Sequence, residues 1–147
     1  LDRQAMPILR YRTRDLTRLI PGVCSCGRTH RRIDRITGRS DDMFIIKGCN
    51  IFPIQIERVL MRIPEVGHDY LVTLQTIEGT DEMIIEVEIH PDCFRDDFGA
   101  LEQLRRRIAA AVRDEVLVTP LVKLAEPGKL PRSEGKAVRV RDERTLQ

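Results

Sequence analysis

The chain has 147 residues, of which 41% are hydrophobic and 33% charged, and its formal net charge is +2. The aliphatic content and the small net charge exclude a disordered chain. A membrane span is excluded because no apolar run approaches the ~20 residues that a bilayer requires. The first residue is Leu1, and neither an initiator Met nor a signal-peptide pattern precedes the Arg-rich start. We therefore expect a piece of a longer, cytoplasmic protein.

Charge is unevenly distributed along the chain. Residues 1–39 contain ten Arg and three Asp, whereas residues 40–147 contain fifteen basic and twenty acidic residues. A basic segment of this kind suits a phosphate-bearing partner, either a nucleotide or a nucleic acid. A solvent-exposed face explains the same charge, so charge alone leaves both interpretations open.

Three potential metal ligands lie in one short loop of the basic segment. Cys24, Cys26 and His30 are all residue types that bind zinc. The C-x-C spacing differs from the usual C-x2-C, and no fourth ligand follows in the sequence. A structural Zn²⁺ site and an ordinary loop of reduced cysteines therefore both stay open.

A change in character near residue 38 predicts a domain boundary. Residues 1–37 are Arg-rich, with short extended pieces at 8–13 and 16–20. The polar stretch GRSDD at 38–42 is typical of a linker or hinge. Residues 43–147 have the alternating apolar patterns of one compact α+β domain.

The predicted elements of this second part begin with a short strand at 43–47. A helix begins at Pro53 and ends near Pro64, because apolar residues recur at helical spacing. Two alternating strands follow, at 70–74 and 83–89, and a second helix extends from Phe98 to Val112 with both residues on its apolar face. The last strand is predicted at 119–124. The order strand–helix–strand–strand–helix–strand predicts a ferredoxin-like (βαββαβ) fold, which does not by itself define a function.

Three polar stretches are more informative together than separately: YRTRD at 11–15, GRSDD at 38–42 and PRSEGK at 131–136. In this order and spacing they resemble the adenylate-forming family, which includes acyl- and aryl-CoA ligases. The residues around these stretches are most similar to those of the phenylacetate–CoA ligase branch. The resemblance covers nearly the whole chain.

The resemblance implies a two-domain, AMP-forming acid–thiol ligase. Residues 1–37 would be the tail of the large domain, 38–42 the hinge and 43–147 the mobile C-terminal lid. Such enzymes use ATP with Mg²⁺ to adenylate an acid, here an aryl-acetic acid such as phenylacetate, and coenzyme A then displaces AMP. Because the phosphate loop and the acid pocket of the family lie in the large domain, we expect this chain alone to be inactive.

The resemblance also implies roles for residues in the first two stretches. Asp15 matches the aspartate that accepts hydrogen bonds from both ribose hydroxyls of the nucleotide. Arg39 matches a second ribose contact, to which a guanidinium brings a fork of donors. Asp41 matches the hinge position that absorbs the rotation of the lid.

Two further roles concern the reacting groups. Lys136 matches the catalytic lysine, whose ammonium would lie between the substrate carboxylate and the α-phosphate. Gly48 matches the glycine that lines the pantetheine tunnel, where the absence of a Cβ gives room to a thin ligand. Asn50 stands where many acyl-CoA synthetases have an arginine near phosphate, so no phosphate contact is expected there.

Other functions are weighed beside this one. An enzyme of the same branch could pass AMP to another acceptor, such as a deazaflavin cofactor. A stand-alone ferredoxin-like RNA-binding module is disfavoured, because the aromatics are scattered and Glu86 and Glu88 would repel phosphate. A small-molecule-binding module fits the fold, but no motif supports it. We therefore expect small-molecule partners, no nucleic acid and no membrane, and a homodimer through residues 1–36 as one option.

Overall fold

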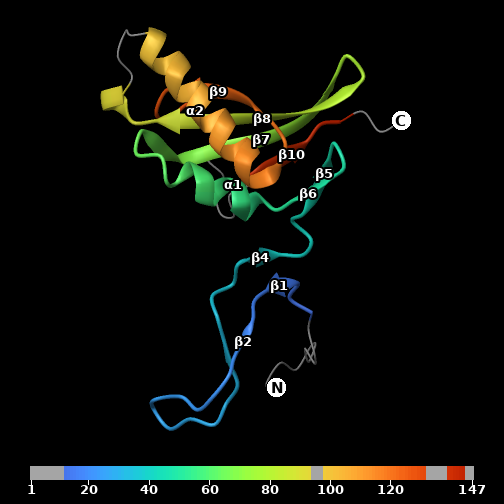
Figure 1. Cartoon of the computed structure of the whole chain (residues 1–147), viewed down its shortest axis with the longest axis vertical. Coiled ribbons are helices and arrows are strands. Elements are labelled where there is room, and N and C mark those ends of the chain that lie inside the picture. The colour runs from blue at the N-terminus through green and yellow to red at the C-terminus, as the bar shows by residue number, and fades with distance from the viewer. Residues whose placement is uncertain (1–11, 94–97, 132–138, 145–147) are drawn as a thin grey trace, which may run out of the picture. The chain divides into compact units, whose positions relative to one another are not determined.

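The computed structural model describes residues 12–93, 98–131 and 139–144. The chain divides into two compact units, unit 1 (Leu1–Asp42) and unit 2 (Met43–Gln147), which are coloured blue to teal and teal to red in Figure 1. The division falls at the end of the GRSDD stretch. No helix in the described ranges is both long and apolar enough to cross a membrane.

Unit 1 contains two small antiparallel sheets. Strand β1 (Asp15–Leu16) pairs with β4 (Gly38–Arg39), and β2 (Leu19–Ile20) pairs with β3 (Arg32–Ile33). The extended piece predicted at 16–20 is thus two separate strands, and the piece predicted at 8–13 lies mostly outside the described residues. Six large apolar side chains of this unit are exposed: Leu16, Leu19, Ile20, Val23, Ile33 and Ile36. Backbone pairing holds the described part of unit 1 together, because these side chains form no buried core.

Unit 2 is a mixed α/β domain. Its elements are the hairpin β5 (Phe44–Ile46) and β6 (Cys49–Ile51), then α1 (Pro53–Leu60), β7 (Val66–Ile77), β8 (Thr80–Ile89), the 3-10 turn η1 (Pro91–Cys93), α2 (Phe98–Val116), β9 (Leu121–Ala125) and β10 (Val140–Asp142). The four-stranded sheet has the order β10-β7-β8-β9. The central pair β7–β8 is antiparallel, and each outer strand runs parallel to its neighbour.

The two helices pack on each other and share one core with the sheet (Figure 1). Helix α1 begins at Pro53, and the backbone N–H of Phe52 donates to Gln55 Oε1 at 2.9 Å, which satisfies one free donor at the helix start. Both helices bury residues that the apolar spacing selects: Ile56, Val59, Leu60, Leu104, Ile108 and Val112. Helix α2 continues past the predicted Val112 to Val116, which is also buried. Phe98 departs from that prediction, since it is the first residue of α2 and is 83% exposed.

The ferredoxin-like arrangement is not confirmed. The strand predicted at 43–47 pairs with β6 in a separate two-stranded sheet instead of joining the main sheet. The fourth strand of the main sheet is instead β10, an outer strand beside β7 that the sequence did not predict. The chain reverses directly after β5 because Lys47 and Gly48 both have positive φ angles, 48° and 78°, as a two-residue type I′ turn requires.

Candidate functional site

A polar hollow in unit 1 brings two of the sequence motifs together. Its volume is about 720 Å³, and its lining residues come from the YRTRD and GRSDD stretches: Arg12, Thr13, Arg14, Asp15, Ser40 and Asp41. The pairing of β1 with β4 explains this proximity, because Asp15 lies directly opposite Arg39 in the ladder. The backbone N–H of Ser40 also donates to the Arg14 carbonyl at 2.8 Å. Two predicted nucleotide contacts therefore stand on neighbouring strands.

Arg39 is held by Asp41 in a two-point contact. Its Nε lies 3.0 Å from Oδ1 and its Nη2 lies 2.9 Å from Oδ2 of the carboxylate. Arg14 Nη1 is 3.6 Å from the same Oδ2. The hydrogen bonds from Arg39 lower the pKa of Asp41 to about 2, and those with Asp41 raise the pKa of Arg39. The predicted hinge residue thus orients the predicted nucleotide-binding arginine.

Asp15 offers a carboxylate toward the same hollow. The residue is half-buried, and its backbone N–H lies 3.4 Å from Thr13 Oγ1. Within residues 12–93, 98–131 and 139–144, the Asp15 carboxylate forms no ion pair closer than 4.0 Å. Its oxygens can therefore accept hydrogen bonds from a ligand with paired hydroxyl donors.

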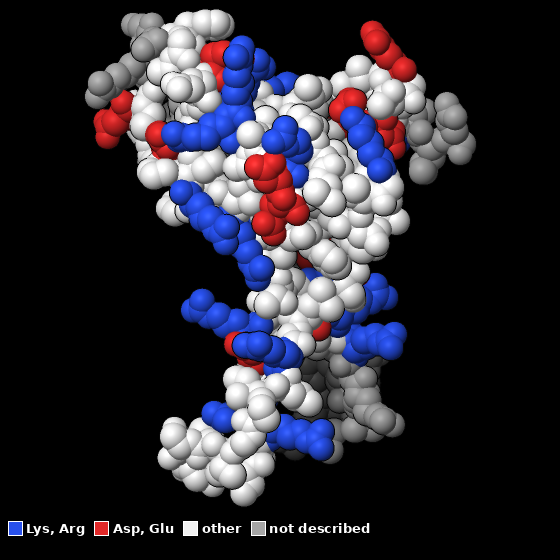
Figure 2. All heavy atoms as spheres, viewed as in Figure 1, with Lys and Arg blue, Asp and Glu red and all other residues white. Residues whose placement is uncertain are grey.

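Basic side chains are frequent in unit 1, which contains the polar hollow. Of the charged side chains that Figure 2 shows on the visible face of unit 1, most are blue, and these are all Arg because residues 1–42 contain no Lys. Arg12 and Arg14 are exposed, and Arg39 is half-buried. This distribution agrees with the basic charge counted along residues 1–39, and it suits an anionic ligand.

Gly48 forms the tip of the β5–β6 hairpin in unit 2. A Cβ built there would meet no described atom within 4 Å, so the space around the turn is open. The neighbouring Lys47 Nζ lies 2.7 Å from Glu82 Oε1, an ion pair that connects the turn to β8. Asn50 is exposed on β6. The turn is therefore both accessible to a ligand and attached to the sheet.

Lys136 lies outside the described residues, whereas residues 126–131 earlier in the chain are described. Glu88, which is 6% exposed, accepts hydrogen bonds from the backbone N–H groups of Gly128 (Oε2, 2.9 Å) and Leu130 (Oε1, 2.8 Å). The sequence interpretation placed Glu88 beside Glu86 as a charge repelling phosphate, whereas Glu88 is buried. No signal in the single sequence separates these two alternating glutamates, because the partners of Glu88 are backbone groups 40 and 42 residues away.

The zinc prediction is not supported. Cys24 Sγ and Cys26 Sγ lie 3.1 Å apart as free thiols, and His30 is exposed. Among the residues that the structure describes, no three His, Cys, Asp or Glu side chains gather in a way that could hold a metal ion. The backbone and side chain of Cys26 lower the pKa of Cys24 by hydrogen bonding. The two cysteines belong to a tight turn, closed by Gly27 N–H donating to Cys24 O at 2.9 Å, and His30 follows that turn.

Comparison with known proteins shows to which protein family the chain belongs. Residues 48–144 match the model of the AMP-binding enzyme C-terminal domain. This match covers most of the chain, which therefore belongs to that family of adenylate-forming enzymes. The resemblance inferred from the three motifs is confirmed.

Individual relatives show which members of this family the chain resembles. Phenylacetate-coenzyme A ligase of Thermus thermophilus is 46% identical over 95% of this chain and 34% of its own length. A crystallised domain of phenylacetate-coenzyme A ligase from Bacteroides vulgatus is 53% identical, with a TM-score of 0.66 over 73% of this chain and 97% of that one. 2-Hydroxyisobutyryl-CoA ligase in its postadenylation state is 32% identical, with a TM-score of 0.75 over 88% of this chain and 28% of that one. The chain spans about a third of the length of the curated relatives that it matches.

Proposed function

We propose that this chain is the C-terminal portion of an ATP-dependent ligase that activates phenylacetate, or a close aryl-acetic acid, as its CoA thioester. The observation that carries the proposal is the 46% identity to a phenylacetate-coenzyme A ligase over 95% of the chain. The polar hollow of unit 1 and the open Gly48 turn of unit 2 support it, because they offer groups suited to a nucleotide and to a thin thiol ligand.

In the first half-reaction, a carboxylate oxygen attacks the α-phosphorus of ATP and the bond to pyrophosphate breaks. Asp15 would accept hydrogen bonds from the ribose hydroxyls, and Arg39, held by Asp41, would add a donor beside it. Lys136 would hold the carboxylate and the α-phosphate together, and it would stabilise the charge that develops on phosphorus.

In the second half-reaction, the CoA sulfur attacks the acyl carbon and AMP leaves, which yields the thioester. Gly48 would line the path of the pantetheine arm, because the turn leaves open space at its tip. Between the two half-reactions, residues 43–147 would rotate as a lid about the 38–42 hinge. The similar 2-hydroxyisobutyryl-CoA ligase is known in a postadenylation state with R3-HIB-AMP and in a thioesterification state with 2-HIB-AMP and CoA.

Mg²⁺ would enter with ATP and neutralise phosphate charge. The described residues offer it no cluster of three or more acidic, His or Cys side chains. We therefore assign no residue of this chain to the ion, and ATP phosphates with the rest of the full-length enzyme would supply its ligands. A cytoplasmic location and a homodimer stay predictions.

Pyrophosphate exchange into ATP tests the proposal in the full-length enzyme. With phenylacetate, the wild type should exchange label, and Lys136→Ala should exchange it ~10²–10³-fold more slowly, because a preorganised charge is lost at the reacting phosphate. Thioester formation with CoA should follow in the wild type.

Other outcomes point elsewhere. Exchange without any thioester would favour transfer of AMP to a different acceptor, such as a deazaflavin. Absence of exchange with every aryl acid tried would exclude the substrate class. Normal exchange by Lys136→Ala would show that the motif assignment at 131–136 is wrong.

A further inference from the structure

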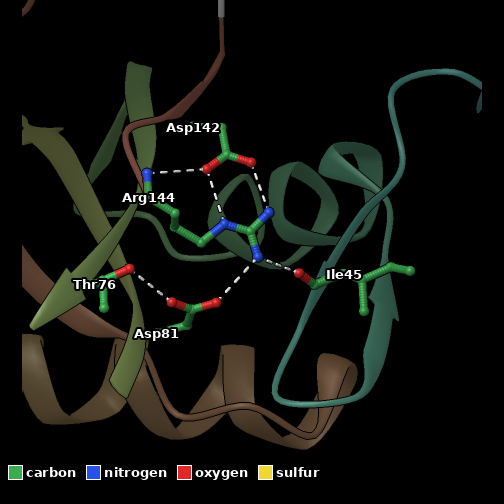
Figure 3. Close-up of polar contacts among 5 residues, drawn as sticks. All are labelled: Ile45, Thr76, Asp81, Asp142 and Arg144. Carbon is green, nitrogen blue, oxygen red and sulfur yellow. Dashed lines mark hydrogen bonds and ion pairs between the residues drawn. The ribbon is translucent and has the colours of Figure 1, made fainter. Parts of the chain in front are cut away.

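One arginine connects three segments of unit 2 that are distant in sequence (Figure 3). Arg144 Nη1 donates to the carbonyl of Ile45 at 2.7 Å. Its Nε and Nη2 contact Asp142 Oδ1 at 2.8 Å and Oδ2 at 2.6 Å. Nη1 also lies 3.3 Å from Oδ2 of Asp81, whose Oδ1 accepts from Thr76 Oγ1 at 2.9 Å. The C-terminal strand, the β7–β8 pair and the β5–β6 hairpin therefore meet at a single guanidinium.

The carbonyl that Arg144 binds is one that the hairpin itself leaves unpaired. In a two-residue hairpin the pair flanking the turn, here Ile46 and Cys49, exchanges hydrogen bonds. Hydrogen-bonded and non-hydrogen-bonded pairs alternate, so the next pair, Ile45 and Asn50, directs its backbone groups away from the partner strand. Arg144 supplies the donor that the outward carbonyl of Ile45 lacks within its own hairpin.

Arg144 is itself held in place before it reaches the hairpin. The backbone N–H of Glu143 donates to the Leu74 carbonyl at 2.9 Å, which extends the contact of this segment with β7. The Arg144 side chain is 23% exposed, so most of it is shielded from water. The hydrogen bonds with Asp142 raise the pKa of Arg144 and lower that of Asp142, in keeping with a fixed ion pair.

We propose that Arg144 is a positioning residue for thioester formation: it fixes the β5–β6 hairpin so that the Lys47-Gly48 turn stands where the CoA arm passes. The inference rests on the function proposed above. The buried side chains of Phe44, Ile46 and Ile51 attach one face of the hairpin to the core. Arg144 holds the backbone edge that those side chains leave free. Its loss should therefore affect the use of CoA more than adenylation.

The test uses the full-length enzyme with Arg144→Gln, Arg144→Lys and the control Arg141→Gln. Arg141 lies on β10, which ends two residues before Arg144, and it is exposed; among the described residues its side chain has no hydrogen bond or ion pair. We expect Arg144→Gln to raise the KM for CoA about tenfold and to leave pyrophosphate exchange within about twofold of wild type. Arg144→Lys should recover part of the loss, because one ammonium can reach Ile45 O but cannot form the fork to Asp142. Backbone amides of residues 43–52 should exchange hydrogen faster in Arg144→Gln only.

The outcomes distinguish a failure of this inference from a failure of the proposed function. A wild-type enzyme that lacks both half-reactions would overturn the proposed function and this inference with it. If the wild type completes both half-reactions and Arg144→Gln matches Arg141→Gln in its KM for CoA, the inference alone is wrong. Equal losses in both half-reactions, or unchanged amide exchange in the hairpin, would also overturn it. If Arg144→Gln does not fold, Arg144→Lys carries the same comparison.

Discussion

At the scale of single residues, Asp41 joins two roles that the sequence suggested separately. Its carboxylate takes both donors of the Arg39 fork at 3.0 and 2.9 Å. A nucleotide that uses Arg39 must therefore share this guanidinium with Asp41 or displace the aspartate. Because Asp41 also lies in the predicted hinge, movement of the hinge and orientation of Arg39 would be coupled through one ion pair.

The titration of Asp41 tests that pair. The pKa of Asp41 lies near 2 instead of its ordinary 3.8, because Arg39 favours the charged carboxylate. A lowered pKa in the folded state means that the pair stabilises the fold fully above about pH 4 and is lost as the pH falls toward 2. Followed by the carboxyl ¹³C shift, the midpoint should move from about 2 in wild type toward 3.8 in Arg39→Ala.

Arg14→Ala is the matched control for this titration. Arg14 lies 3.6 Å from Asp41 without a hydrogen bond, and its charge is the smallest of the causes that shift this pKa. It should therefore move the midpoint less than Arg39→Ala does. The same midpoint in wild type and Arg39→Ala would show that the fork does not form in solution.

At the scale of elements, one buried glutamate connects strand β8 to the segment that follows β9. Glu88 accepts the N–H groups of Gly128 and Leu130, and the Leu130 side chain is buried as well. A buried carboxylate is stable only when hydrogen bonds replace its lost hydration. The chain is thereby fixed up to Leu130, directly ahead of the PRSEGK motif at 131–136.

Removal of this carboxylate should be costly. We expect Glu88→Ala to lower the free energy of unfolding by about 2–3 kcal/mol, because it leaves two N–H donors without their acceptor. Glu86→Ala is the control two residues earlier: Glu86 is paired at 3.3 Å with Lys123, whose side chain is 61% exposed, and loss of such a pair costs about 0–1 kcal/mol. Urea unfolding of the three proteins measures the difference, and equal midpoints for the two variants would contradict the role given to Glu88.

At the scale of the whole molecule, long periodic segments could be predicted, whereas the pairing of the short strands could not. The spacing of Ile56, Val59 and Leu60 placed α1 correctly, and alternation placed β7 and β8, because each pattern spans enough residues to define a face. β5, β6 and β10 have three residues each, too few for a period. β10 joins the sheet beside β7, where Val140 pairs with Val72, 68 residues earlier in the chain, so its place there could not be predicted.

The residues of the candidate site also fall into those that the sequence could indicate and those that it could not. The stretches that contain Asp15, Asp41 and Gly48 could be selected from motif order, since they are polar or glycine positions that packing does not require. Glu88 and Arg144 could not, because their partners are backbone groups brought close only by folding. The zinc prediction is not supported for a different reason. Its three residues are close in sequence, but the fold does not bring His30 together with the two thiols.

The two hairpin turns of unit 2 allow backbone strain to be separated from function. Gly48 and Gly79 both have φ of 78°, each follows a residue with φ near 50°, and a Cβ at either glycine meets no described atom within 4 Å. An alanine at either position should therefore cost a similar ~1–2 kcal/mol of stability.

Only Gly48 stands on the proposed CoA path. In the full-length enzyme, Gly48→Ala should keep pyrophosphate exchange and lose thioester formation about 100-fold, whereas Gly79→Ala should keep both. Equal thioester rates in the two variants would remove Gly48 from the CoA path, and a joint loss of exchange would point to misfolding of unit 2 instead.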